Sequence, residues 1–346
     1  MHWTEEIWIG VKCTSKNKRK HSGTGTAVLL CTGVIAAAAL LILAMLYYRT
    51  NYDFTAKYEK AHYSGNIYQG SMFASDLCVA SENVALDGFS DDEELHGAGL
   101  FEVNEGRVVY GYNMFERLYP ASTTKLLTAY VALKYGNPSD VVTISEHAVD
   151  FEWDEVTCGL EAGDQVTLYD LLCGLLLQSG NDCGTAIAEH IAGSEEAFAD
   201  LMNSEARALG ATGSHFLNPH GLHDENHYTT VYDLYLIFNA CIKDSRFMDI
   251  ISMQIYTGTM TSSDGTVRTN LWSATNYYSA ELAEAPQGVR VFGGKTGTTD
   301  EAGSCVILYN EDFSENPYIS IIMGAPDKEQ LYEEMNRLLE AGMTKN

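Results

Sequence analysis

The chain has few basic residues for its length. Lysine and arginine number 21 among 346 residues, against 47 aspartates and glutamates, so the formal net charge is −26 at pH 7. A surface with this excess of negative charge repels nucleic acid and anionic lipid headgroups. We therefore expect no nucleic-acid partner. The charge is explained by solubility and indicates no specific partner.

No two cysteines have the Cys-x-x-Cys spacing of zinc and redox motifs, so no metal or other cofactor is predicted. Six cysteines lie beyond residue 48: Cys78, Cys158, Cys173, Cys183, Cys241 and Cys305. Their even number permits disulfides, but their spacing is not that of a small stapled scaffold. Cys173 and Cys183 stand in apolar helical contexts, where we expect buried free thiols. The pairing stays open.

One long run has no charged residue, from Thr26 to Tyr48. As a helix it measures roughly 35 Å, against about 30 Å for the hydrocarbon core of a bilayer. Residues 1–25 carry five lysines and arginines, which the positive-inside rule places in the cytoplasm. We therefore predict a single-pass membrane protein with a cytoplasmic basic tail at 1–25, a transmembrane helix at 26–48 and an extracytoplasmic remainder. A cleaved signal peptide is the alternative.

The remainder divides by composition. Residues 49–72 show no sustained hydrophobic period and residues 87–94 are acidic, so residues 49–94 are predicted to form a stalk or linker. Residues 95–346 are long enough for one well-filled core or two closely packed lobes, and they contain no internal repeat.

Three short motifs lie in this domain: Ser122-Thr123-Thr124-Lys125, Ser179-Gly180-Asn181 and Lys295-Thr296-Gly297. The first precedes a helix-forming run without glycine or proline until Gly136, so Ser122 is predicted at a helix N-terminus. Residues at i and i+3 share a helix face, which lets Lys125 approach the Ser122 hydroxyl.

The second motif separates two apolar helical patterns, and Thr167 and Asp170 begin the first of them at capping-box spacing. We expect Ser179 and Asn181 in a short loop between two helices, although a pair of helix caps is the simpler alternative. The third motif lies in the segment 289–299, which begins with alternating apolar residues and is rich in glycine. This pattern predicts a strand that other backbone or a ligand approaches closely. A plain glycine-rich hairpin is the alternative there.

Single motifs of this kind recur by chance, as at Ser15 to Lys18, but their order and surroundings support one site. The set is that of penicillin-binding proteins and class A β-lactamases. From about residue 95 onward the chain resembles the serine-type D-alanyl-D-alanine carboxypeptidases, the low-molecular-mass penicillin-binding proteins of peptidase family S11. The matching stretches are 119–125, 178–182, 218–222, 227–230 and 295–303.

The coarse pattern predicts an α+β fold. A hairpin at 99–110 precedes the motifs, and strands near 289–297, 303–309 and 318–324 follow them, before a final amphipathic helix near 327–341. Helices are expected around 167–192, 195–209 and 229–242. This order favours an antiparallel sheet built from both termini with a helical lobe inserted. The resemblance implies the β-lactamase/penicillin-binding-protein transpeptidase fold, with the site between the lobes.

The resemblance also implies a mechanism. Ser122 attacks the carbonyl between the two terminal D-alanines of a peptidoglycan stem peptide, and water later hydrolyses the acyl-enzyme. Lys125 is the expected base, with a pKa lowered by burial and by Lys295.

In the same scheme Ser179 passes a proton to the leaving amine, while Asn181 holds the substrate backbone or the base. The expected ligands of the terminal carboxylate lie in the strand motif: Lys295, Thr296, Gly297 and Thr298. The backbone N–H groups of Ser122 and Thr298 form the oxyanion site. β-Lactams are the expected inhibitors.

Several rivals share these residues. A D,D-endopeptidase, a transpeptidase or a sensor that acylates without turnover would use the same motifs. A class A β-lactamase needs a glutamate that the family pattern places near 215–219, where this chain has no carboxylate. A metal-binding module could use His215, His220, His223, His227, Asp224 and Glu225, but they lack the i, i+4 spacing of a helical zinc site.

Overall fold

The computed structural model describes residues 40–42, 74 and 76–344. The chain divides into two compact units, Met1–Ser71 and Met72–Asn346. Residues 40–42 are helical, and they are the part of the first unit that is described. All elements below belong to the second unit.

The membrane prediction requires a correction. No helix in the described stretches is long and apolar enough to cross a bilayer. The predicted spanning segment at 26–48 lies outside the described residues except for 40–42. We therefore withdraw the assignment to the cell membrane as a single-pass protein. The prediction rested on the hydropathy and length of one run and on the basic residues before it, which are sequence features without a structural counterpart among the described residues.

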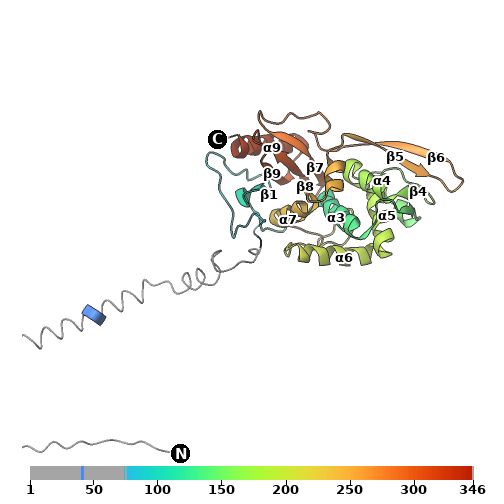
Figure 1. Cartoon of the computed structure of the whole chain (residues 1–346), viewed down its shortest axis with the longest axis horizontal. Coiled ribbons are helices and arrows are strands. Elements are labelled where there is room, and N and C mark those ends of the chain that lie inside the picture. Colours follow the sequence, from blue (N-terminus) through green and yellow to red (C-terminus); the bar gives the residue numbers. More distant parts are fainter. Residues whose placement is uncertain (1–39, 43–73, 75, 345–346) are drawn as a thin grey trace, which may run out of the picture. The chain divides into compact units, whose positions relative to one another are not determined.

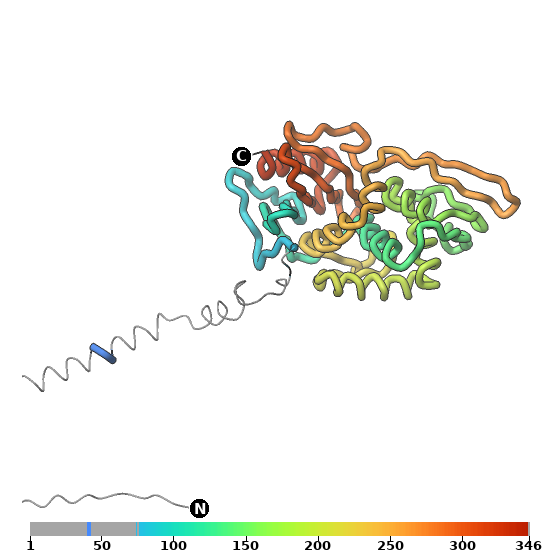
Figure 2. Tube along the Cα trace, in the orientation of Figure 1, coloured from blue at the N-terminus to red at the C-terminus, as the bar shows by residue number. Residues whose placement is uncertain are grey.

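The sheet at the centre of the second unit is built from both ends of the domain, as predicted. Its five antiparallel strands follow the order β2-β1-β9-β8-β7. Their bounds are β1 Gly97–Glu102, β2 Arg107–Tyr112, β7 Arg290–Thr299, β8 Gly303–Glu311 and β9 Pro317–Ala325. The early strands accordingly run beside the red C-terminal strands in Figure 2.

The two faces of this sheet serve different cores. On β8, Val306 and Leu308 join one buried cluster while the intervening Ile307 joins the other, because successive side chains of a strand point to opposite faces. The first cluster is closed by α9 (Lys328–Met343), which packs along β9 through residues such as Leu338 (Figure 1). The amphipathic helix predicted near 327–341 is therefore present, and it packs on the sheet.

The other core contains the helical lobe. Its elements are the 3-10 turn η1 (Ala121–Thr124), α3 (Lys125–Tyr135), η2 (His147–Val149), α4 (Leu168–Cys173), the π-helical turn η3 (Gly174–Gln178), α5 (Asn181–Ala192), α6 (Glu195–Ala208), α7 (Val231–Cys241) and α8 (Ser245–Ile251). The predicted cap is present, since the Thr167 hydroxyl accepts a hydrogen bond from the Asp170 N–H at 3.0 Å. The expected helices are thus found, with α8 in addition.

A second antiparallel sheet was not predicted. Its order is β3-β4-β5-β6, with bounds Val141–Thr143, Gln165–Thr167, Ile255–Thr261 and Val267–Ser273. β5 and β6 form a long hairpin that extends from one end of the second unit (Figure 1). The inward face buries Met260 and Trp272, and the opposite face mixes threonines with the exposed side chains of Ile255, Val267 and Leu271. A sequence signal existed, because Asp264-Gly265 between two alternating runs is a strong hairpin signature.

Part of the predicted linker contacts the domain core. The Cys78 N–H donates to the Tyr235 hydroxyl at 2.7 Å, and the Cys78 side chain is fully buried. Val84 exchanges two backbone hydrogen bonds with Gly111 on β2. Residues between 76 and 94 thus pack on the second unit, although the predicted domain begins only at residue 95.

Candidate active site

Ser122 lies in the 3-10 turn that leads into α3, and Lys125 is the first residue of that helix. The lysine Nζ donates to Ser122 Oγ at 2.8 Å. Lys125 is fully buried, whereas Ser122 is half-buried and can be reached from outside. The structure therefore brings the predicted serine and lysine together as the i, i+3 spacing requires.

The turn that carries Ser122 is held by close backbone packing. Ala121 has a φ of 46°, which is unusual for a residue other than glycine. A Cβ on Gly221 would meet the Ala121 carbonyl oxygen at 1.9 Å, and one on Gly297 would lie 2.9 Å from the Ser122 nitrogen. Glycine at both positions thus allows the 218–222 loop and strand β7 to approach the nucleophile turn.

Two further acceptors fix the Lys125 amine. Its Nζ donates to Asn181 Oδ1 at 2.8 Å and to the carbonyl oxygen of His220 at 2.6 Å. Asn181 is the first residue of α5 and not a loop residue, which corrects the predicted placement by one position. With Ser122 these acceptors account for three directed hydrogen bonds, which is the full donor capacity of an ammonium group.

Ser179 follows the π-helical turn and adopts a left-handed conformation with φ 66°. This conformation ends the π-helical turn before α5, and Ser179 and Asn181 contact different lysines. Lys295, on β7, donates from Nζ to Ser179 Oγ at 2.9 Å and to the Thr296 carbonyl oxygen at 2.8 Å. Strain of this kind costs about 1–3 kcal/mol and is concentrated at functional sites.

The two lysines are both fully buried, which disfavours their charged forms. Burial lowers the pKa of Lys125 to about 7, while the Asp182 carboxylate acts in the opposite direction. The pKa of Lys295 lies well below its ordinary value, first because of burial and second because of the Lys125 charge. Lys125 can therefore be neutral or charged near pH 7.

The remaining predicted residues continue along β7. The Thr296 hydroxyl is 2.7 Å from that of Thr275, a residue that the sequence did not single out. Thr298 is exposed two positions further along the same strand. Since β7 is at the edge of the sheet, these groups border a surface on which an extended ligand can lie.

Two other parts of the site were missed. The His220 carbonyl carries no side-chain signal, and only its place in the matching stretch 218–222 pointed to this segment. Asp182 is buried, and its carboxylate accepts hydrogen bonds from the backbone of Cys158, Leu160 and Cys183. Its position directly after the second motif, before an apolar helix, was the available signal. Asp182 thereby joins the start of α5 to the segment before β4.

The four histidines of the rival metal-binding module do not share partners. Their contacts are His215 Nδ1 to the Asn226 carbonyl oxygen (2.6 Å), His220 Nε2 to Glu195 (3.6 Å), His223 Nδ1 to Glu301 (3.8 Å) and His227 Nε2 to the Thr124 hydroxyl (2.9 Å). Burial also lowers the pKa of His227 to about 3. This arrangement gives the metal-binding alternative no support.

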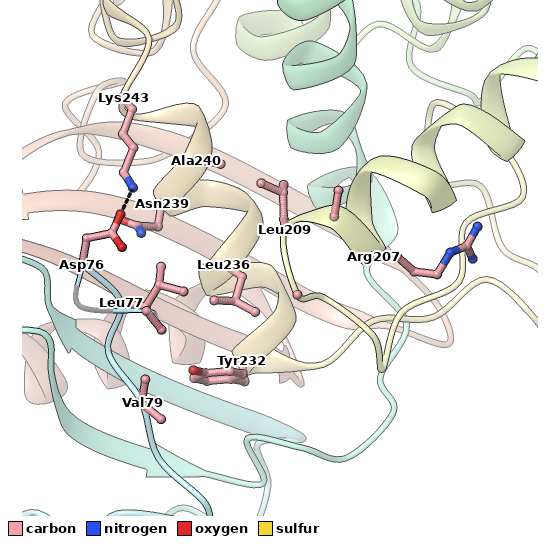
Figure 3. A pocket seen from close by; sticks show the side chains of 13 residues that line it. Asp76, Leu77, Val79, Arg207, Leu209, Tyr232, Leu236, Asn239, Ala240 and Lys243 are labelled. Atoms are coloured by element: carbon pink, nitrogen blue, oxygen red, sulfur yellow. Dashed lines mark hydrogen bonds and ion pairs between the residues drawn. The ribbon is translucent and has the colours of Figure 1, made fainter. Parts of the chain in front are cut away.

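A separate cavity of about 800 Å³ lies on another part of the second unit, between residues 76–79 and the helices α6 and α7 (Figure 3). Tyr232 and Leu236 line it, and Lys243 forms an ion pair with Asp76 at 2.8 Å on its border. Among the described residues that line it, none belongs to the three motifs. It is therefore not the candidate active site.

Comparisons with known proteins agree with this geometry. The family model of the D-alanyl-D-alanine carboxypeptidases, Peptidase_S11, matches residues 92–327. The D-alanyl-D-alanine carboxypeptidase DacF of Bacillus subtilis is 32% identical over 256 residues, which are 71% of this chain and 61% of that protein. DacA of Haemophilus influenzae is 32% identical over 253 residues, 70% of this chain and 60% of that protein. The chain thus spans about three fifths of the length of these curated relatives.

Solved structures agree as well. The Streptomyces K15 DD-transpeptidase matches with a TM-score of 0.68 and 25% identity, covering 74% of this chain and 100% of that chain. The D-alanyl-D-alanine carboxypeptidase of Mycobacterium tuberculosis matches with a TM-score of 0.66 and 26% identity, covering 76% and 97%. The predicted transpeptidase-type α+β fold is confirmed. The chain belongs to the D-alanyl-D-alanine carboxypeptidase family of peptidases.

Proposed function

We propose that this protein is a serine D,D-carboxypeptidase that removes the terminal D-alanine from peptidoglycan stem peptides. The observation that carries the proposal is the contact of Ser122 with a fully buried lysine whose pKa is close to neutral. Family membership of the matched segment supports the same reaction. We infer that residues 95–346 form the catalytic domain and that the described residues 76–94 pack onto it.

In the acylation step, neutral Lys125 accepts the Ser122 proton while the serine oxygen bonds to the carbonyl carbon of the scissile D-Ala-D-Ala bond. The 2.8 Å separation between the two side-chain atoms is already suitable for this transfer. Asn181 and the His220 carbonyl keep the amine in place. The developing oxyanion is stabilised by the backbone N–H groups of Ser122 and Thr298, each typically worth about 3 kcal/mol.

The leaving D-alanine needs a proton on its nitrogen and a partner for its carboxylate. We infer that Ser179, which accepts a hydrogen bond from Lys295, passes on to this nitrogen the proton that Lys125 took from Ser122. Lys295 with the Thr296 and Thr298 hydroxyls binds the carboxylate, and Gly297 lets the strand pass close to the nucleophile. Water then hydrolyses the acyl-enzyme, and β-lactams inhibit by forming a stable acyl-enzyme at the same serine.

The experiment is D-alanine release from a diacyl-Lys-D-Ala-D-Ala peptide by the full chain, with Ser122→Ala as the inactive control. Release that depends on Ser122 is the expected result. Absence of release from wild-type protein with a normal melting transition would contradict the proposal.

One observation favours a second candidate, since the Streptomyces K15 neighbour is named a DD-transpeptidase. Adding glycylglycine as an acceptor to the same assay distinguishes the two. A carboxypeptidase yields the peptide shortened by one residue, whereas a transpeptidase yields mainly the glycylglycine adduct. If the glycylglycine adduct predominates, the protein is a transpeptidase and not a carboxypeptidase.

A further inference from the structure

Two cysteines meet beside the second motif. Cys183 lies in the first turn of α5, two residues after Asn181, and Cys158 lies between η2 and β4. Both thiols are free, with 4% exposure at Cys158 and none at Cys183. Their sulfur atoms are within 4.8 Å of each other. This pair takes no part in the mechanism above.

The backbone holds these two residues next to each other. The N–H groups of Cys158 and Cys183 both donate to Oδ1 of Asp182, each at 2.9 Å. The carbonyl oxygen of Cys158 accepts from Asn270 at 3.0 Å and from the Trp272 indole at 3.2 Å. Because both N–H groups bind the same oxygen atom, the backbones of Cys158 and Cys183 lie close together. Such an arrangement is compatible with a disulfide, whose two Cα atoms are usually about 4.4–6.8 Å apart.

The space around the pair is small. A Cβ on Gly174 would lie 2.7 Å from both sulfur atoms, and one on Gly180 would lie 2.5 Å from the Cys158 sulfur. The thiols therefore pack against bare backbone and against each other. Side chains at these two positions would occupy the space of the thiols, so glycine there keeps the sulfur atoms next to each other.

A metal ion is a weaker fit for the same residues. Both oxygens of Asp182 already accept backbone hydrogen bonds, from Cys158 and Cys183 on one and from Cys158 and Leu160 on the other. Two thiols would remain, whereas structural zinc sites almost always have four protein ligands. The pair is better suited to a bond between its own members.

We propose that Cys158 and Cys183 form a disulfide by exchange with a low-molecular-mass disulfide, which ties the segment before β4 to the start of α5. Deprotonated Cys158 attacks one sulfur of the small disulfide RSSR, forming a mixed disulfide and releasing one thiolate. Cys183 then loses its proton and attacks the Cys158 sulfur, releasing the second. The protein loses two hydrogens, and RSSR is reduced to two RSH.

Burial determines when this reaction takes place. Neither sulfur is open to a small disulfide in the folded domain, and burial raises the pKa of both thiols, which keeps them protonated. Exchange is therefore expected during folding, before the segment around Cys158 closes over α5. The finished bond encloses the second motif and should raise Tm by roughly 5–10 °C through its effect on the unfolded chain.

The test is to unfold the full chain under reducing conditions and refold it with a mixture of reduced and oxidised glutathione. Remaining thiols are then alkylated, and non-reduced peptides are mapped by mass spectrometry. The expected products are a linked Cys158–Cys183 peptide pair, a mass lower by two hydrogens and a higher Tm that dithiothreitol treatment reverses. Refolding with reduced glutathione alone gives the reference protein.

Cys241→Ala is the matched control, because Cys241 is equally buried but lies on α7 with its thiol directed to the Leu126 carbonyl. This variant should keep both the linked pair and the Tm gain. Cys183→Ala should lose both, and its Tm under reducing conditions separates loss of the bond from misfolding. Alkylation of both Cys158 and Cys183 in refolded protein, or stoichiometric zinc that depends on them, would overturn the proposal.

Discussion

Lys125 and Lys295 occupy the same site and are both fully buried, yet their surroundings differ. Lys125 has three acceptors, and the Asp182 carboxylate acts to raise its pKa. Lys295 has two acceptors, and the electrostatic partner resolved for it among the described residues is the repelling Lys125. The protein itself supplies all the hydrogen-bond acceptors that the Lys125 amine can use. The Lys295 amine is destabilised in its charged form by burial and by the Lys125 charge, and a bound anion would offset both.

The difference indicates a division of labour within the proposed mechanism. A buried amine with satisfied hydrogen bonds and a pKa close to neutral is suited to accept and return a proton. A buried amine without a negatively charged partner is suited to bind an anionic group of the substrate. In the proposed reaction this group is the carboxylate of the terminal D-alanine. Removing Lys125 should therefore mainly lower kcat, whereas removing Lys295 should mainly raise KM.

The largest effect is expected from Lys125→Met, which removes the proposed base while roughly preserving side-chain length. General base catalysis contributes typically 10²–10⁴-fold, so we expect kcat to fall by about 10³-fold. Turnover of the diacyl-Lys-D-Ala-D-Ala peptide measures kcat, and stopped-flow reaction with a chromogenic β-lactam should show a similar loss in the acylation step.

Lys134→Met is the control for that variant, because Lys134 lies in the last turn of the same helix and pairs with Glu205 at its surface. It should retain wild-type acylation. Equal losses in the two variants would show that the effect comes from the helix and not from the base.

The pH dependence should show the next largest effect. If neutral Lys125 is the base, kcat/KM rises with pH through about 7, the value to which burial lowers its pKa, and then levels off. Each pH unit below that value leaves about tenfold less neutral amine, so activity at pH 5 should be about 100-fold lower. A profile that is flat between pH 5 and 8, in protein whose melting temperature is unchanged over that range, would remove Lys125 from this role.

A smaller effect, and of another kind, is expected from Lys295→Met. A hydrogen bond to a charged group contributes about 1.5–3 kcal/mol, or roughly 10–150-fold, and the loss should fall mainly on KM for peptides with a free terminal carboxylate. Hydrolysis of the matching C-terminal amide should already be poor in the wild type and change little in the variant. An equal loss for acid and amide peptides would contradict carboxylate binding by Lys295.

The contrast between the lysines was only partly predictable from sequence. The i, i+3 spacing placed Ser122 beside Lys125 because a helix has one geometry. The order of strands near both termini likewise predicted the five-stranded sheet. The burial that lowers both pKa values comes from packing of segments distant in sequence. The sequence therefore could not show whether burial or the Lys295 charge has the larger effect on the pKa of Lys125. In the structure the resolved effect is that of Lys125 on Lys295.

Other features were hidden for specific reasons. The His220 carbonyl belongs to the backbone, and the left-handed Ser179 departs from what its residue type favours, so local propensity could indicate neither. Strands β3 and β4 have three residues each, too few to show a period. The β5–β6 hairpin, by contrast, had a readable turn at Asp264-Gly265 and was overlooked.

The central claim is that Ser122 carries the acyl group, and the most direct measurement is peptide mapping of the protein after reaction with benzylpenicillin. We predict one covalent adduct, of the mass of intact penicillin, on the peptide that contains Ser122 and Lys125. The adduct should be absent from Ser122→Ala. An adduct on another residue, or one that persists in Ser122→Ala, would contradict the account.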